Sequence, residues 1–425
     1  MNLLIIILNF VAYFITFIYH YMHERLTIRT LFWLNFSLFS AFSIPLLASG
    51  LYFNVMEYST IKPSDSLSVL PYVMMYCFVS ILMSPFKYTK NVLLLSNIRF
   101  DYMNLQSKNI VRFSLFMMVI YLLLKIMQVS IVIRVGFGYF HDLEANIKDE
   151  ILYSNNYILK YINYACKLVV VMLSPCIIFY LYYGFKRGII KKINFYIYFI
   201  VYIVDVLVVG IVAGSRGTIY FGILTIVFFF IMTKIINSIR NKFGIVLFLL
   251  PLILIVLYVL SNITHERFDT TMAIEDNIIR YLGESFLNLG FEFYNHIKNH
   301  TDGRLFFSFL FEDYSMSDIS NYTGLHIWWF ETTYGTLFVD FDSFTPLLVA
   351  TIIAIGMKYY IKKHFGKIEY IGLILYYYQF CCYIPFGYRM QLFDIVIILL
   401  LIVFPRIFNI LFLKKKKNEI VAFVG

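Results

Sequence analysis

The sequence predicts an all-α polytopic integral membrane protein with about eleven transmembrane helices and one large extracytoplasmic loop. Three observations lead to this prediction. The chain is 61% hydrophobic and only 14% charged, whereas soluble domains carry about 25% charged residues. Its apolar residues gather into stretches long enough to cross a bilayer, which takes about 20 residues per helix. Its basic residues recur in every second connection between these stretches, as they do on the cytoplasmic side of a membrane protein.

The predicted spans divide the chain into three parts. The N-terminal part, residues 1–262, holds eight expected spans, at 2–20, 30–53, 67–85, 111–133, 157–183, 193–213, 217–233 and 244–262. The large external loop follows at 263–342. The C-terminal part, residues 343–425, holds spans at 343–361, 369–386 and 391–412 and a basic tail. The first stretch lacks the basic start and the small-residue cleavage site of a signal peptide, so we expect it to be a span.

The basic residues also predict the orientation. Clusters such as Lys186–Lys192 occupy alternate connections, which the positive-inside rule places in the cytoplasm. The other connections, including 134–156 and 263–342, are richer in Asp and Glu and are expected outside. We therefore predict an external N-terminus and a cytoplasmic C-terminus. This placement explains the net charge of +10 without any nucleic-acid partner.

One segment of the long loop has helical periodicity. Within residues 275–300, apolar side chains recur at Ile278, Leu282, Phe286, Leu289, Phe293 and Ile297. A second stripe, four residues apart, is polar and consists of Arg280, Glu284, Asn288 and Glu292. Such a helix could lie on the membrane surface or line a cavity, with its polar stripe toward water or a substrate.

The sharpest local motif is Gly214-Ser215-Arg216-Gly217, which joins two spans with almost no loop on the external side. The glycines permit tight backbone geometry and close approach of a ligand. Arg216 lies where lipid head groups sit, and a guanidinium can bind phosphate oxygens through two hydrogen bonds. The alternative interpretation is an arginine that snorkels from a tight turn.

Other external residues are candidates for substrate contact. Arg280, Arg304 and Arg389 add positive charge to a region that is otherwise acidic, although Arg280 could simply pair with Glu284 one helical turn on. Trp328 and Trp329 could stack on sugar rings or form an interfacial aromatic belt. The histidines of the long loop, including His326, could act as a general base toward a hydroxyl.

The sequence predicts no metal site and no cofactor. The five cysteines, at 77, 166, 176, 381 and 382, all fall in predicted spans and lack zinc-type spacing. His296 and His300 have the spacing of a metal pair without the glutamate of a zinc-protease motif. Asp340-Phe341-Asp342 has the Asp-x-Asp pattern of nucleotide-sugar enzymes, but nucleotide sugars are expected in the cytoplasm. There is no phosphate-binding P-loop.

Three charged residues lie inside predicted spans, namely Lys125, Asp205 and Asp394. Charge in lipid is costly, so each is expected to face a cavity or a partner. Lys125 and Asp205 could form one structural ion pair. Asp205 also lies about three turns before Arg216 and could line the same cavity.

Two stretches together resemble the O-antigen polymerase, or Wzy-type, family. One is Gly214-Ser215-Arg216-Gly217 at an external hairpin. The other is 332–341, Thr-Thr-Tyr-Gly-Thr-Leu-Phe-Val-Asp-Phe, which resembles the stretch that closes the late external loop of that family. The family usually has a glycine shortly after the Asp-Phe pair, where this chain has Asp342 and Ser343. The resemblance covers most of the chain as topology and these two stretches as sequence.

The resemblance implies a metal-independent glycosyltransferase of the bacterial cytoplasmic (inner) membrane, with a GT-C-like helical fold. Such enzymes join oligosaccharide repeat units carried on undecaprenyl diphosphate into O-antigen, a part of lipopolysaccharide, or into capsule. A chain-length regulator and a flippase would be its partners. Arg216 and Arg280 would stabilise the diphosphate leaving group. Glu284 or His326 would be the base, while Gly214, Ser215, Gly217, Arg304, Arg389, Trp328 and Trp329 would contact substrate.

Three alternatives stay open at the level of sequence. A ligase that moves finished glycan to another acceptor would share the topology and the arginine chemistry. A flippase for lipid-linked oligosaccharides should have shorter, more even loops than the loop at 263–342, paired halves and charged residues along a central path. The last alternative is a structural membrane component without catalytic activity.

Overall fold

The computed structural model describes residues 1–54, 61–91, 105–136, 140, 145–153, 156–186, 188–212, 216–232, 274–311, 316–326, 332–364, 370–387, 390 and 392–413. Every regular element in these residues is a helix, which confirms the all-α prediction. The chain divides into two compact units. Unit 1 comprises Met1–Val92, Thr270–Phe365 and Tyr378–Asp394, and unit 2 comprises Leu93–Asp269, Gly366–Tyr377 and Ile395–Gly425.

Six helices in the described part of the chain are long and apolar enough to cross a membrane. They are α1 (Asn2–Glu24), α2 (Ile28–Ala48), α3 (Leu70–Met83) with its 3-10 extension η3 (Ser84–Asn91), α4 (Leu105–Val135), α7 (Tyr157–Lys186) and α8 (Lys192–Val212). They coincide with the first six predicted spans, so the chain is a helical membrane protein by length and composition.

Four more predicted spans also coincide with helices. These are α9 (Arg216–Met232), α15 (Thr345–His364), α16 (Ile371–Tyr383), which continues into η9 (Ile384–Phe386), and α17 (Leu392–Leu413). The remaining predicted span, 244–262, lies outside the described residues. The total of eleven spans therefore stays a prediction.

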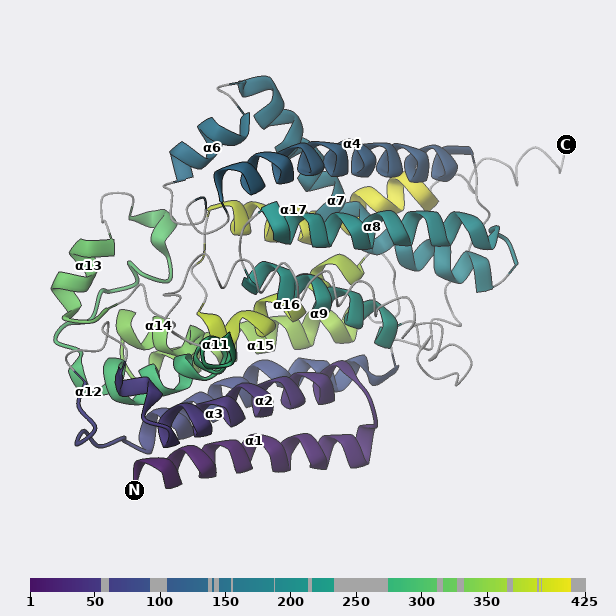
Figure 1. Ribbon diagram of the computed structural model, residues 1–425. Coiled ribbons are helices and arrows are strands. Elements are labelled where there is room, and N and C mark those ends of the chain that lie inside the picture. The colour runs from purple at the N-terminus through teal and green to yellow at the C-terminus, as the bar shows by residue number, and fades with distance from the viewer. Residues whose placement is uncertain are drawn as a thin grey trace, which may run out of the picture. The chain divides into compact units, whose positions relative to one another are not determined.

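Unit 1 is built on the hairpin of α1 and α2, which run side by side (Figure 1). Thr27 begins α2 with a capping box: its hydroxyl accepts the N–H of Thr30 at 3.2 Å, and the Thr30 hydroxyl accepts the N–H of Thr27 at 2.7 Å. Between the helices, Tyr13 packs on Trp33 and Phe36 with ring centroids 6.0 and 5.5 Å apart. These buried rings hold the hairpin together, since each removes a large apolar area from solvent.

The periodic segment of the long loop forms an interior helix of unit 1. It runs as α11 (Ile274–Asn288), a π-helical turn η6 (Leu289–Phe293) and the short α12 (Tyr294–His296). A Cβ added at Gly283 would stand 2.6 Å from the backbone carbonyl of Phe42 on α2, so only glycine allows this approach. The Ser43 hydroxyl then donates to the Gly283 carbonyl at 2.9 Å. Both faces of this helix are buried between Gly283 and Phe293.

The described residues of the long loop after α12 also form regular elements. They are the 3-10 turn η7 (Ser308–Leu310) and the helices α13 (Met316–Thr323) and α14 (Thr333–Asp340). Thr332 begins α14 by accepting the N–H of Gly335 at 2.9 Å. All residues of α14 are buried. The stretch that resembles the end of the family's loop is therefore a packed helix.

Unit 2 contains α4, α7, α8 and α9, with the short α6 (Ala145–Tyr153) against α4 and α7. Figure 1 shows α4 and α8 side by side. Phe229 on α9 joins the helices, because its ring lies 5.3 Å from Phe179 on α7 and 5.5 Å from Tyr202 on α8. Gly222 on α9 lies against Val206 on α8, where an added Cβ would approach a side-chain methyl to 3.0 Å.

Candidate functional site

Four polar side chains of the α11–η6 helix, hereafter the polar row, are buried inside unit 1. They are Arg280, Glu284, Asn288 and Glu292, with exposed fractions of 7, 1, 0 and 1%. Buried polar groups cost free energy unless they are hydrogen-bonded or paired. The partners of this row therefore determine what the site can do.

The first half of the polar row is an ion pair. Arg280 Nε donates to Glu284 Oε2 at 2.9 Å, one helical turn away. This is the pairing that the four-residue spacing allowed. In a buried pair of this kind, the attraction between the two partners offsets part of the cost of removing them from water.

The middle of the row is tied to the turn after α2. Tyr52, in the 3-10 turn η1 (Leu51–Asn54), donates its hydroxyl proton to Asn288 Oδ1 at 3.0 Å. Burial raises the pKa of Tyr52 well above its usual value, and the negative charges of Glu284 and Glu292 raise it further. The hydroxyl therefore stays a hydrogen-bond donor and cannot serve as a base.

The row ends at a glutamate–histidine pair. Glu292 Oε1 lies 3.2 Å from His326 Nδ1 and also accepts the backbone N–H of His326 at 3.3 Å. Glu292 Oε2 is buried and has no hydrogen-bond partner among the described residues. The His326 side chain is 37% exposed, whereas that of Glu292 is 2% exposed. A buried carboxylate that orients a partly exposed imidazole is an arrangement suited to general base catalysis.

Local hydrogen bonds place His326. It follows α13, which ends where Gly324 adopts a φ of +72° and donates to the Ser320 carbonyl at 2.8 Å. The backbone N–H of Lys298, just after α12, donates to the Thr323 carbonyl at 2.9 Å. The Asn299 side chain donates to the Tyr322 carbonyl at 3.0 Å. The chain after α12 and the end of α13 are thus fixed together, three residues before His326.

The two carboxylates of the Asp-x-Asp motif have separate structural roles. Asp340 is fully buried and accepts the backbone N–H groups of Leu305 at 2.8 Å and Phe306 at 2.6 Å, and also the hydroxyl of Thr301. Asp342 accepts the N–H groups of Thr345 and Phe344, which lower its pKa and cap α15. In the described part of the chain, no group of three His, Cys, Asp or Glu residues is arranged to hold a metal ion.

The structure brings only some of the predicted site residues together. Arg280, Glu284 and His326 lie on or beside the polar row, and the half-buried Arg304 lies in the turn that Asp340 holds. Arg216 and Gly217 begin α9 in unit 2, but their side-chain surroundings lie outside the described residues. Gly214, Ser215, Trp328, Trp329 and Arg389 also lie outside them.

Sequence reasoning placed Glu292 on the polar stripe but gave it no role. Its spacing from Arg280, Glu284 and Asn288 was the available signal. Its partner His326 is 34 residues further along the chain. Periodicity shows which residues share a helix face, but it does not show what that face meets.

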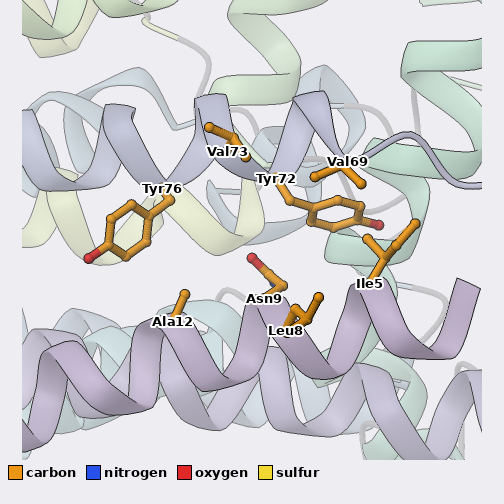
Figure 2. A pocket seen from close by; sticks show the side chains of 8 residues that line it. All are labelled: Ile5, Leu8, Asn9, Ala12, Val69, Tyr72, Val73 and Tyr76. Atoms are coloured by element: carbon orange, nitrogen blue, oxygen red, sulfur yellow. The ribbon is translucent and has the colours of Figure 1, made fainter.

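An apolar groove lies between α1 and α3 in unit 1 (Figure 2). Its volume is about 200 Å³, and it is lined by Ile5, Leu8, Asn9, Ala12, Val69, Tyr72, Val73 and Tyr76. A dry cavity of about 150 Å³ can hold benzene, so the groove has room for a short piece of hydrocarbon. Asn9 donates to Ser40 Oγ at 2.9 Å, and Tyr72 donates to the Phe286 carbonyl at 2.9 Å. These polar groups hold helices together, so the groove is not a reactive site.

Comparison of the chain with models of protein families, with curated proteins and with solved structures finds no match.

Proposed function

We propose that the protein is a glycosyltransferase that polymerises undecaprenyl-diphosphate-linked oligosaccharide repeat units on the external face of the bacterial cytoplasmic membrane. The observation that carries this proposal is His326, held by the buried Glu292 at the end of a polar row that also contains an arginine. It lies in the segment between predicted spans, where the sequence expects the external loop. The eleven-span topology is part of the same proposal.

The reaction needs a base and a stabiliser of negative charge. A hydroxyl of the acceptor repeat unit attacks the anomeric carbon of the donor glycan, a new C–O bond forms, and the bond to the diphosphate oxygen breaks. His326 takes the hydroxyl proton, and the Glu292 carboxylate stabilises the imidazolium that results. Arginines near the head-group plane, with Arg216 as the main candidate, stabilise the charge that grows on the departing lipid diphosphate.

The test compares two variants, Glu292→Gln and His326→Ala, each expressed in a strain that lacks the native gene copy. The measured quantity is the length of the surface polysaccharide. A general base contributes on the order of 10²–10⁴-fold in rate, so both variants should shift surface polysaccharide to single or few repeat units. The matched control is Glu275→Gln, which removes an exposed carboxylate from the same helix. It should leave the length distribution unchanged.

Membrane levels of each variant must equal the wild type, because a folding defect would also shorten the glycan. Normal-length polysaccharide made by a well-expressed His326→Ala variant would overturn the proposed mechanism. Loss of surface glycan together with full-length glycan retained on its lipid carrier would instead identify a ligase.

A further inference from the structure

Unit 2 contains a second set of buried polar groups, separate from the polar row. Tyr198 on α8 links two buried serines on the neighbouring helices α4 and α7. Its hydroxyl lies 2.6 Å from Ser114 Oγ on α4 and donates to Ser174 Oγ on α7 at 3.1 Å. Both serines are fully buried. The three helices are candidate membrane spans, so this hydrogen-bonded group lies within the membrane-spanning part of the unit.

Two ionisable groups lie further along the same helices. Lys125 on α4 is 7% exposed and Asp205 on α8 is 1% exposed. Lys125 Nζ donates to Gln128 Oε1 at 2.8 Å and stands 5.2 Å from the centre of the Tyr121 ring. Its charge acts on Asp205. Asp205 Oδ1 is buried and accepts no hydrogen bond from a described residue.

Helix periodicity connects the two sets. Tyr198, Tyr202 and Asp205 share one face of α8, and the seven steps from Tyr198 to Asp205 span about 10 Å at a rise of 1.5 Å per residue. The groups that interact electrostatically with Asp205 are Lys125 and Tyr121 on α4, Cys166 on α7, and Tyr198 and Tyr202 on α8.

The other helices that pack here add few titratable groups. On α6, Tyr153 interacts with Tyr121. On α9, Gly222 lies against Val206 of α8 and the Phe229 ring lies 5.5 Å from that of Tyr202, and neither contact brings a titratable side chain of α9. Lys125 is therefore the one charged neighbour of Asp205 among the described side chains.

We propose that Asp205 is a proton-binding site inside the membrane-spanning part of unit 2, with Lys125 as its counter-charge and the tyrosine and serine hydroxyls as a relay. A proton that reaches Asp205 converts the carboxylate to a carboxylic acid, and each relay hydroxyl accepts one proton as it releases another. Asp205 Oδ1, which is buried and accepts no hydrogen bond from a described residue, is the atom that can take up the proton. An unsatisfied buried acceptor is costly, and protonation relieves this cost because a carboxylic acid is neutral.

A metal cation fits this site less well than a proton. The ammonium group of Lys125 repels a cation at Asp205. The surrounding tyrosine, serine and cysteine groups also supply no second carboxylate. A proton needs only the one carboxylate and a chain of hydroxyls.

The test uses the full-length protein in liposomes that contain a pH-sensitive dye. A potassium diffusion potential set by valinomycin drives protons inward. Wild-type protein should admit protons faster than protein-free liposomes, and Asp205→Asn should reduce entry to the protein-free rate. Asp205→Glu should restore entry. Glu150→Gln, which removes an exposed carboxylate on α6 of the same unit, should behave as the wild type.

A second variant keeps the proposal testable if Asp205→Asn misfolds. Tyr198→Phe keeps the ring and removes the relay hydroxyl, so it should slow proton entry while eluting as a monodisperse protein. Equal proton entry in wild type and Asp205→Asn, or wild-type entry no faster than in protein-free liposomes, would overturn the proposal. If Asp205→Asn does not reconstitute, unchanged entry in Tyr198→Phe would overturn it instead.

Discussion

Two glutamates of the polar row serve different partners although they lie on one continuous helix. Glu284 accepts a hydrogen bond from Arg280, and Glu292 meets His326. The first carboxylate neutralises an arginine, whereas the second holds a partly exposed histidine in one orientation. The proposed base is therefore His326 with Glu292. Glu284, the other candidate from sequence, is engaged with Arg280.

At Arg216, the two interpretations predict different results for two substitutions. If Arg216 holds the lipid diphosphate, Arg216→Ala should abolish long glycan, and Arg216→Lys should be badly impaired because lysine cannot form two parallel hydrogen bonds to phosphate. Loss of such a contact costs about 2.7–4 kcal/mol in the transition state, or roughly 100- to 1000-fold in rate. The readout is polysaccharide length at equal protein level, with Arg112→Ala, an exposed arginine of α4, as control. Normal-length glycan from Arg216→Ala would leave Arg216 as a snorkelling turn residue.

At the scale of elements, the position of α11 depends on its close approach to α2. Gly283 meets the backbone of Phe42 and Ser43, and the Ser43 hydroxyl bonds its carbonyl. Gly290 in the π-helical turn lies against the side chain of Tyr72, with an added Cβ 2.5 Å from its hydroxyl. Two glycines thus allow a polar helix to enter the packed interior of unit 1.

We expect Gly283→Ala to destabilise the protein by about 1–3 kcal/mol, because the added methyl must push α11 away from backbone atoms that cannot move alone. Gly356→Ala on α15 is the matched control, since an added Cβ there meets nothing within 4 Å. It should be neutral or raise the free energy of unfolding by about 0.5–1 kcal/mol. The midpoint of unfolding in detergent measures both. Equal midpoints for the two variants would show that the approach of α11 to α2 is not tight.

At the scale of the whole molecule, charge placement predicts which connections face the cytoplasm. In a cysteine-free background, Lys191→Cys and Ser317→Cys put single thiols at exposed positions on opposite sides of the predicted topology. An impermeant thiol reagent should label position 317 in intact cells and position 191 only after lysis. The native cysteines are buried or half-buried, so their removal should disturb the surface little. Labelling of 191 but not of 317 in intact cells would invert the model of topology.

Much of the helical framework could be predicted from the sequence, because apolar length is read directly from composition. The predicted spans 157–183 and 193–213 match α7 and α8 within three residues. The predicted span 30–53 ends early, at Ala48, where Pro45 lies in the last turn and Gly50 adopts a φ of +72°. Local turn chemistry of this kind overrides a continuous apolar pattern.

The candidate site could be predicted only in part. The polar stripe of α11 follows from four-residue spacing, but its burial depends on the glycine contact with α2, more than 200 residues away along the chain. The Asp-x-Asp motif also carried no sign that backbone amides occupy both carboxylates. Contacts between residues far apart in the chain determine these roles, and such contacts cannot be deduced from a single sequence.

The π-helical turn at Leu289–Phe293 sets the rotational phase of the helix beyond it. There the N–H of Tyr294 donates to the carbonyl of Leu289, five residues back. Such a turn holds one residue more than an α-helical turn, so the following residues are turned by about 100° from the positions of an uninterrupted α-helix. Removal of one residue between Asn288 and Tyr294 would hardly change the composition or the hydrophobicity of the chain. It would, however, rotate Glu292 toward a different neighbour. The contact between Glu292 and His326 thus depends on the number of residues in this turn as well as on their identity.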